Sequence, residues 1–256
     1  MSIRASEELV NKQAEGFGMK ELLADFQIYI YSGSQPTTAD DEPNGTNLAI
    51  MTLDGGAFVG PTTSIGSVTL TGVAGQVDSI GVGGLAENLL SAAVAFDTDL
   101  TTTAAAVAAN INAKMNFLNI TADNTLGVVN LYAPEWMGAL ADGLTVASSG
   151  SGGITATPAN FAGGVTAVNG CNFDFPAAAG VIGKPSGDTW KGTAINAGTA
   201  GWFRVCPGNN TPTGSGQVRF DGLLATSGGD MQIGSLTISL GAVQTVTQFD
   251  ITMPQS

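Results

Sequence analysis

Thirty-six glycines, spread along all 256 residues, divide this chain into short apolar runs. Many of these runs alternate apolar with polar residues, as residues 26–31 and 235–240 do. Alternation with a period of two places the apolar side chains on one face of a β-strand, and the intervening glycines favour tight turns. Hydrophobic residues make up 43% of the chain and charged residues 11%, which is the reverse of a disordered composition. The sequence therefore predicts a folded, mainly β protein, with an antiparallel β-sandwich or barrel-like domain.

The N-terminal segment is expected to be helical rather than β. Ser6 is a plausible N-cap, because Glu7 and Glu8 follow it in the first turn and Lys12 comes later. Residues 3–24 also carry many large apolar side chains for a chain terminus, and termini fray unless they dock. Two docking partners remain open, the chain's own sheet and a neighbouring molecule.

Strands and one interior helix account for most of the remaining sequence. Strands are expected at residues 26–31, 47–53, 67–70, 76–80, 119–122, 128–132, 143–147, 189–194, 200–205, 217–225, 235–240, 243–247 and 248–254. The alanine-rich stretch 101–115 predicts a helix that Thr103 caps, with Val107 and Ile111 on one face. The run 148–153 is expected to be a flexible turn because it consists of serine and glycine.

Composition changes near Pro61 and changes back after Val165. Residues 64–165 contain one lysine, Lys114, against seven acids, and their strand–helix–strand pattern is self-contained. The sequence predicts that residues 1–63 and 166–256 form a discontinuous β domain with an N-terminal helical arm. Residues 64–165 are expected to form an inserted α+β module, since a folded insert in a surface loop adds little loop-closure entropy.

The residue types exclude several kinds of chemistry. With no histidine in the chain, a Ser-His or Cys-His nucleophile pair cannot form. Cys171 and Cys206 are expected to be reduced and at least partly buried, although a disulfide stays open if their strands are adjacent. Two thiols without histidine do not complete a structural zinc site. We therefore expect no catalytic, cofactor-binding or metal-binding residues.

Carboxylates offer the strongest enzymatic alternative, a glycosidase pair. The candidates are Asp97 with Asp99, the run Asp40, Asp41 and Glu42, and Asp230. A carboxyl group that acts as an acid needs an apolar pocket, whereas these lie in Thr/Ser/Gly-rich stretches. Aspartate in such turns accepts backbone hydrogen bonds, and this is the expected role, with incidental Ca²⁺ binding as a lesser alternative.

The charge balance disfavours two kinds of partner. A net charge of −13 disfavours nucleic acid, because that partner is bound mainly through Lys and Arg. An anionic membrane is disfavoured for the same reason. The start of the chain has no apolar signal core, and no apolar run reaches the length of a spanning helix, so we expect a soluble protein made in a cytoplasm. Trp190 and Trp202 are expected in the core, and Trp136 either anchors a loop or contacts a partner.

Several segments resemble virion structural proteins of tailed bacteriophages. The segment 30–53 is similar to the pattern IYSGSQPxTADxxPxGTxLxxxTL that occurs near the start of such proteins. Their closing pattern resembles residues 198–204, 221–222, 226–230 and 249–254. The middle of the chain resembles a module that recurs as an insert in phage structural proteins, through residues 77–80, 111–113 and 161–165.

The resemblance implies a non-enzymatic virion protein, synthesised late in the cytoplasm of a bacterial host. It implies no catalytic residues. The implied partners are copies of the chain and other virion proteins, such as major capsid or neck proteins, in a homo-oligomer. The preferred position is a capsid decoration protein or a collar component in the neck, at the head–tail connector region. The alternative is a tail or fibre component that contacts the host; a polysaccharide-degrading spike is a third class.

Overall fold

The chain folds as two units, and the second is inserted into the first. The computed structural model describes residues 3–177 and 180–252. The first unit consists of the chain up to Gly60 and from Ala167 onward, and we call it the barrel unit. The second, Pro61–Thr166, is called the insert. The insert expected from composition, residues 64–165, begins three residues after this unit and ends one residue before it.

The barrel unit is a closed β-barrel of seven strands. Its strands follow one another in the order β14-β15-β17-β12-β3-β2-β13, and β13 pairs with β14 to close the ring. Neighbours are antiparallel except β14 and β15, which are parallel. The mainly β fold class expected from the sequence is confirmed, in its barrel form. The strands are β2 (Phe26–Ser32), β3 (Asn47–Leu53), β12 (Trp190–Thr193), β13 (Gly198–Pro207), β14 (Phe220–Ala225), β15 (Met231–Ile233) and β17 (Val243–Thr252).

Short strands extend the barrel at its edges. They are β1 (Arg4–Ala5) on β14, β11 (Val181–Gly183) on β17, and β16 (Thr237–Ile238) on β13. The two strands expected at residues 243–247 and 248–254 are a single strand, β17. Met253 and Pro254 of that expectation lie outside the described residues.

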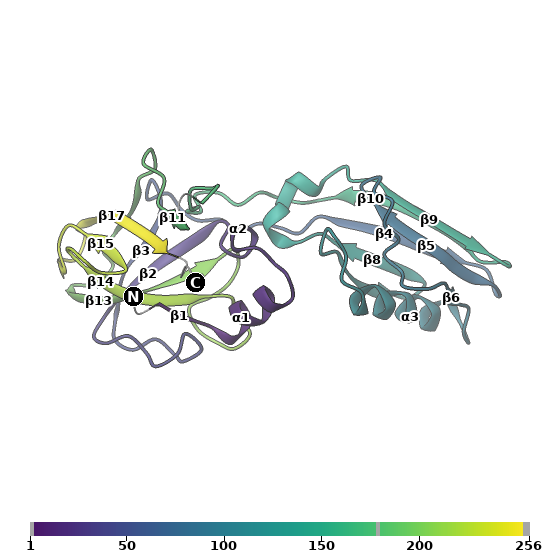
Figure 1. The fold of residues 1–256 in the computed structure, drawn as a ribbon, viewed down its shortest axis with the longest axis horizontal. Helices are drawn as coiled ribbons and strands as arrows, with labels where there is room; N and C mark the ends of the chain where they lie inside the picture. Colours follow the sequence, from purple (N-terminus) through teal and green to yellow (C-terminus); the bar gives the residue numbers. More distant parts are fainter. Residues whose placement is uncertain (1–2, 178–179, 253–256) are drawn as a thin grey trace. The chain divides into compact units, whose positions relative to one another are not determined.

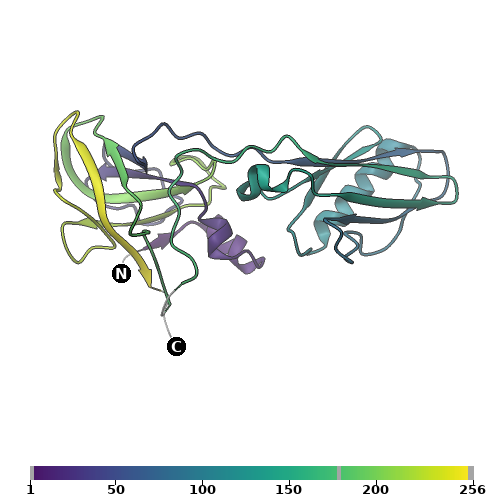
Figure 2. The ribbon, with the colours of Figure 1, turned by 90° about the horizontal axis from the view of Figure 1, so that it is seen from above.

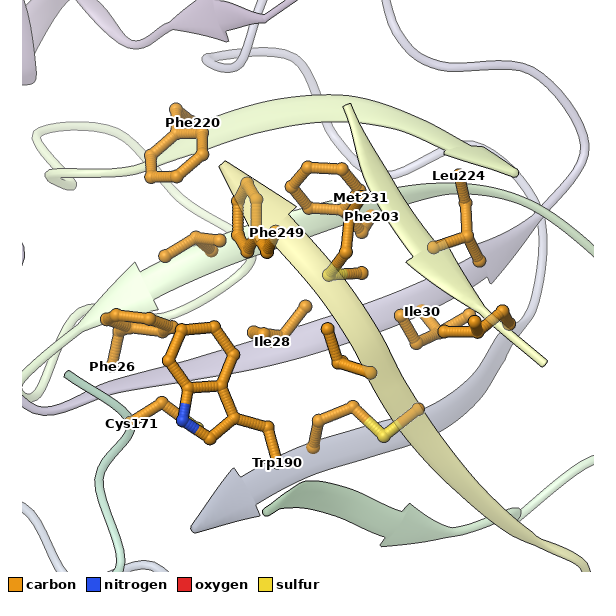
Figure 3. Packing of buried hydrophobic residues seen from close by; sticks show 14 of the residues in the cluster. Phe26, Ile28, Ile30, Cys171, Trp190, Phe203, Phe220, Leu224, Met231 and Phe249 are labelled. Atoms are coloured by element: carbon orange, nitrogen blue, oxygen red, sulfur yellow. The ribbon is translucent and has the colours of Figure 1, made fainter. Parts of the chain in front are cut away.

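Aromatic rings fill the barrel (Figure 3). Phe249 on β17 lies near the centre, with its ring 5.0 Å from Phe203, 5.2 Å from Phe173 and 6.2 Å from Trp190. The inward residues of the strands alternate with outward ones, as the period of two requires. Edge-to-face contacts of this kind add to the free energy of burying the rings.

The N-terminal arm packs on the chain's own barrel. Helix α1 (Glu7–Ala14) is capped by the Ser6 hydroxyl, which accepts the Leu9 N–H at 3.2 Å, as the sequence predicts. Helix α2 (Met19–Leu22) follows, and Leu9, Leu22 and Leu23 join the core of the barrel. Figure 2 shows the purple α1 in the barrel unit. The described apolar residues of the arm are therefore mostly used internally, and Val10 stays 51% exposed.

The insert has two small sheets, one helix and a core of its own. One sheet has the order β10-β4-β8-β7 and the other β6-β5-β9. The helix α3 (Leu100–Ala113) packs on the first sheet, with Val107 and Ile111 fully buried (Figure 1). The remaining elements are β4 (Ile65–Thr71), β5 (Gln76–Val82), β6 (Val94–Ala95), β7 (Thr121–Thr125), β8 (Val128–Tyr132), the 3-10 helix η1 (Glu135–Ala141), β9 (Val146–Ser151) and β10 (Thr155–Ala162).

Two expectations for the insert were wrong. Helix α3 is capped by Asp99, whose carboxylate accepts the Thr102 N–H at 2.7 Å, and the helix begins earlier than expected. Thr103 instead lies inside the first turn, and its hydroxyl donates to the Asp99 carbonyl. The expected flexible turn 148–153 is mostly strand, because its serines pair with β5; Ser79 and Ser149 are joined by their hydroxyls at 2.7 Å.

The two chain segments that lead into and out of the insert are paired with each other. Val59 and Val168 exchange both backbone hydrogen bonds, and so do Thr62 and Val165. This pairing brings the two ends of the barrel unit together where the insert leaves it. Across residues 3–177 and 180–252, no helix has the length and apolar character needed to cross a membrane.

Removing the insert should leave a folded barrel. Each unit has its own buried core, and Thr62 and Val165 already face each other across a ladder. We expect a chain in which a short Gly/Ser turn joins these two residues to unfold cooperatively in a thermal melt followed by circular dichroism. Loss of any cooperative transition would show that the barrel strands depend on the insert.

Candidate functional site

Strand β13 is buried on both faces, which is unusual for a barrel strand. Phe203 and Val205 point into the core, while Trp202, Arg204 and Cys206 lie on the outer face, where a strand of a small barrel normally meets water. All of these side chains are 2% exposed or less. Hydrogen bonds from Arg204 to backbone carbonyls show what covers the outer face: two polar loops, residues 33–46 and 208–217.

A buried ion pair lies under these loops. Arg204 on β13 is directly opposite Asp221 on β14 in the ladder. Its Nε and one terminal nitrogen donate to the two carboxylate oxygens of Asp221 at 2.7 and 2.8 Å, and both residues are fully buried. A bidentate pair of this geometry is among the strongest hydrogen-bonded contacts that side chains make.

All the arginines of the chain donate to the backbone of one loop. Arg204 donates to the Asp41 carbonyl at 3.0 Å, and Arg219 donates to the carbonyls of Ala39 at 2.5 Å and Asp40 at 3.1 Å. Arg4 donates to the carbonyl of Pro36. We call this set, Arg4, Arg204, Arg219 and Asp221, the arginine cluster. Its arginines hold the loop 33–46 on the barrel through four backbone carbonyls, those of Pro36, Ala39, Asp40 and Asp41.

The same arginines also hold the second loop. The Pro212 carbonyl accepts from Arg204 at 2.6 Å, and the Gly214 carbonyl accepts from Arg219 at 2.8 Å. Glu42 accepts the Gly214 N–H at 3.0 Å and so links the two loops directly. The N–H groups of these guanidinium groups therefore donate to backbone carbonyls of the protein itself. The arrangement is suited to holding backbone in place.

Aromatic stacking closes the far end of the loop. Trp202 stacks on Tyr31 with ring centroids 4.5 Å apart, and its indole N–H donates to the Asn44 carbonyl at 3.2 Å. Gly45 then returns the chain to β3 with φ +84°, and a Cβ there would lie 2.1 Å from the Ser32 carbonyl oxygen. A side chain at position 45 would therefore push the loop off the barrel.

Burial and charge act against each other in the arginine cluster. Burial raises the pKa of the Asp221 carboxyl, and the hydrogen bonds and charge of Arg204 oppose that rise. Burial disfavours the charged form of Arg204, but the hydrogen bond and charge of Asp221 outweigh it, so the pKa of Arg204 is raised. Burial and the charge of Arg204 lower the pKa of Arg219. The pair is the main compensation for charge that would otherwise be costly to bury.

The carboxylates proposed for a glycosidase accept backbone hydrogen bonds. Asp40 accepts the Glu7 N–H at 2.8 Å, and Asp41 accepts the Thr38 N–H at 2.9 Å. Asp97 accepts the Thr98 N–H at 2.7 Å, and Asp230 accepts the Leu223 N–H at 2.9 Å. In Asp99, the hydrogen bond from the Thr102 backbone holds the pKa below its usual value. These are the structural roles that the turn sequences indicate.

The other residues considered from the sequence have structural positions too. Trp190 is fully buried in the barrel core, and Trp136 is partly buried in η1. Within the described ranges, no group of three or more Cys, Asp or Glu side chains is arranged to hold a metal ion. The sequence places Asp221 in the closing pattern but assigns it no role, although a charged residue inside an apolar strand run, as in residues 217–225, is the signal that marks a buried ion pair.

Both cysteines are free and buried, on opposite faces of the barrel wall. Cys171 pairs with Phe26 at the end of β2 and belongs to the core. Cys206 lies on the outer face of β13 beneath the loops. Burial raises the pKa of the Cys206 thiol to about 12 and also raises that of Cys171. Both thiols are therefore protonated near neutral pH, which makes them poor nucleophiles.

Comparison of the sequence with protein-family models and with curated proteins, and of the fold with solved structures, finds no match.

Replacing Asp221 by Asn should destabilise the barrel strongly. The change leaves Arg204 buried beside Arg219 without its counter-charge, and breaking a buried pair in this way costs about 3–5 kcal/mol. Urea unfolding of the full chain measures the difference. The matched control is Asp54→Asn, an exposed aspartate at φ +53°, for which we expect a change within about 0.5 kcal/mol. Equal effects of the two substitutions would show that the pair contributes little.

The thiols should react only when the protein unfolds. We expect an aromatic disulfide reagent to label neither cysteine in the native chain at neutral pH, and to label both in denaturant without prior reduction. Intact mass before and after alkylation measures the count. Protection of both thiols in denaturant would reveal a disulfide and contradict the free, separated thiols.

Proposed function

We propose that this chain is a non-enzymatic structural protein of a tailed-phage virion, a capsid decoration protein or a collar component of the neck. It would stabilise the particle through contacts with its own copies and with major capsid or neck proteins. The observation that carries the proposal is the arginine cluster. Two of the segments that resemble phage virion proteins, 30–53 and 198–204, meet there although they are far apart in the sequence.

Residues of those two segments bond to each other and hold the loop 33–46 on the barrel. In the first segment, Ala39, Asp41 and Asn44 offer backbone carbonyls. In the second, Trp202 donates to the Asn44 carbonyl and Arg204 to the Asp41 carbonyl, whereas the Ala39 carbonyl accepts from Arg219, which lies outside both segments. A sequence pattern whose members secure a loop to a barrel is typical of a scaffold. A catalytic pattern would instead direct its side chains at a space for substrate. The geometry thus supports a structural role over an enzymatic one.

The charge distribution supports a protein partner. The arginines are engaged with internal carbonyls, so the remaining cationic side chains are lysines: Lys12, Lys20, Lys114, Lys184 and Lys191. Lys12 lies beside Glu8 and Glu15, and Lys114 lies beside Glu87. Few cations are therefore left to neutralise phosphates, which weakens the case for nucleic acid beyond what the net charge of −13 already does.

A tail or fibre component that contacts the host is the second candidate. One observation favours it: Val73 and Leu126 are 84% and 72% exposed in the turns after β4 and before β8. Thr69 of β4 is opposite Val128 of β8, so both turns lie at one end of the same sheet. An exposed apolar end on the insert would suit contact with another surface.

Mass spectrometry and cryo-electron microscopy of purified phage particles test the proposal. We expect the chain in a fixed copy number per particle, with density for a seven-stranded barrel at the outer head or the neck. Density at the tail tip would favour the second candidate. Absence from purified particles, or release of reducing sugar from host polysaccharide by the purified chain, would contradict the virion-scaffold proposal.

A further inference from the structure

Two long segments of the barrel unit carry no charged side chain. The segments 192–203 and 231–249 contain no Asp, Glu, Lys or Arg, in a chain with 21 acidic and 8 basic residues. The first segment covers the end of β12 and the start of β13, and the second covers β15, β16 and most of β17. Strands β15, β17 and β12 are consecutive in the barrel, and β16 pairs with β13, so the two uncharged segments contact each other at two places.

Backbone pairing brings the centre of this region together. Thr193 is opposite Val243 in the β12–β17 ladder. Beyond that pair, the Ala194 N–H donates to the Ala242 carbonyl, and the Gly241 N–H donates to the Ala194 carbonyl, each at 2.9 Å. Ile195 and Leu240 adjoin this contact, one on each side. We call residues 193–197 and 239–247 the uncharged end.

The uncharged end presents large apolar side chains to solvent. Leu240 is 70% exposed, Val243 is 63% exposed and Ile195 is 51% exposed. Thr245 and Thr247 follow Val243 on the outer face of β17, and Lys191, directly opposite Thr245, is the charged residue at the border of this surface. The backbone beneath is held firmly, since the N–H groups of Ile195 and Asn196 both donate to the Leu48 carbonyl. A rigid apolar surface of this kind loses little conformational entropy on binding.

We infer that the uncharged end is a contact surface for a second copy of this chain. Copies with a charge of −13 repel one another wherever their acidic surfaces meet. The uncharged end is where two copies can approach without opposing carboxylates, so apolar burial there is least offset by repulsion. A basic partner would instead be attracted to the acidic surfaces. This inference adds to the proposed function the face through which copies of the chain meet. Only the placing of that contact in a virus particle rests on the proposed function.

Salt dependence distinguishes a second copy from a charged partner. Added salt screens the repulsion between two acidic copies, since the Debye length falls from about 10 Å at 0.1 M to about 3 Å at 1 M. Self-association through an uncharged face should therefore strengthen with salt. Sedimentation equilibrium of the full chain at about 0.05 M and about 0.5 M NaCl measures this, and we expect the dissociation constant to fall at the higher salt.

The matched substitutions are Leu240→Asp at the uncharged end and Leu140→Asp in the insert, where Leu140 is 73% exposed. We expect Leu240→Asp, and likewise Ile195→Asp, to raise the dissociation constant about tenfold or more, since each introduces a carboxylate on both copies. Leu140→Asp should leave it unchanged. Thermal melting checks that all three variants fold, because exposed positions tolerate polar residues.

Three results would overturn the inference: a monomer at every concentration up to about 1 mM, association that weakens with salt, or equal effects of Leu240→Asp and Leu140→Asp. Each is measured on the isolated chain. The inference can therefore fail while the protein is still found in virions, and it can hold when the protein is absent from them.

Discussion

The buried pair of Arg204 and Asp221 is the interaction on which the barrel unit depends. A guanidinium removed from water needs both a counter-charge and partners for its remaining donors, or the cost of desolvation is several kcal/mol. Asp221 provides the charge, and the carbonyls of Asp41 and Pro212 accept the other donors. Because those carbonyls belong to two long polar loops, satisfying one buried cation also determines where both loops lie.

This arrangement explains how a barrel with few charged residues holds the loops on its outer face in one position. The interior is held by aromatic packing around Phe249, which is non-directional and tolerates small shifts. The outer face is held by directional hydrogen bonds from Arg204 and Arg219 and by the stacking of Trp202 on Tyr31. The loop 33–46 is thereby a fixed part of the barrel wall, available as a rigid surface.

The two units distribute charge differently, and this bears on what each is suited to do. The insert's core is complete without the barrel, and Asp99 and Asn112 serve its own helix and strand edge, the latter by bonding both backbone groups of Ala122. The barrel unit buries Arg204 and Arg219 beneath its two polar loops, and it has two long segments without charged residues. A net charge of −13 disfavours close approach of two acidic surfaces, and the proposed contact between copies uses a region without acidic residues for this reason.

The sequence by itself determined the fold class, the N-terminal helix that begins after Ser6, and most strands, because alternation and capping are local signals. Its composition also indicated the insert. It did not determine that β13 and β14 close a ring, or that Cys171 and Cys206 lie on opposite faces of one wall. It missed the role of Asp221, and it assigned to Thr103 the cap that Asp99 provides. Those features depend on which strands become neighbours. Strand pairing is determined by the burial of segments that are far apart in the sequence, and a local sequence pattern carries no information about it.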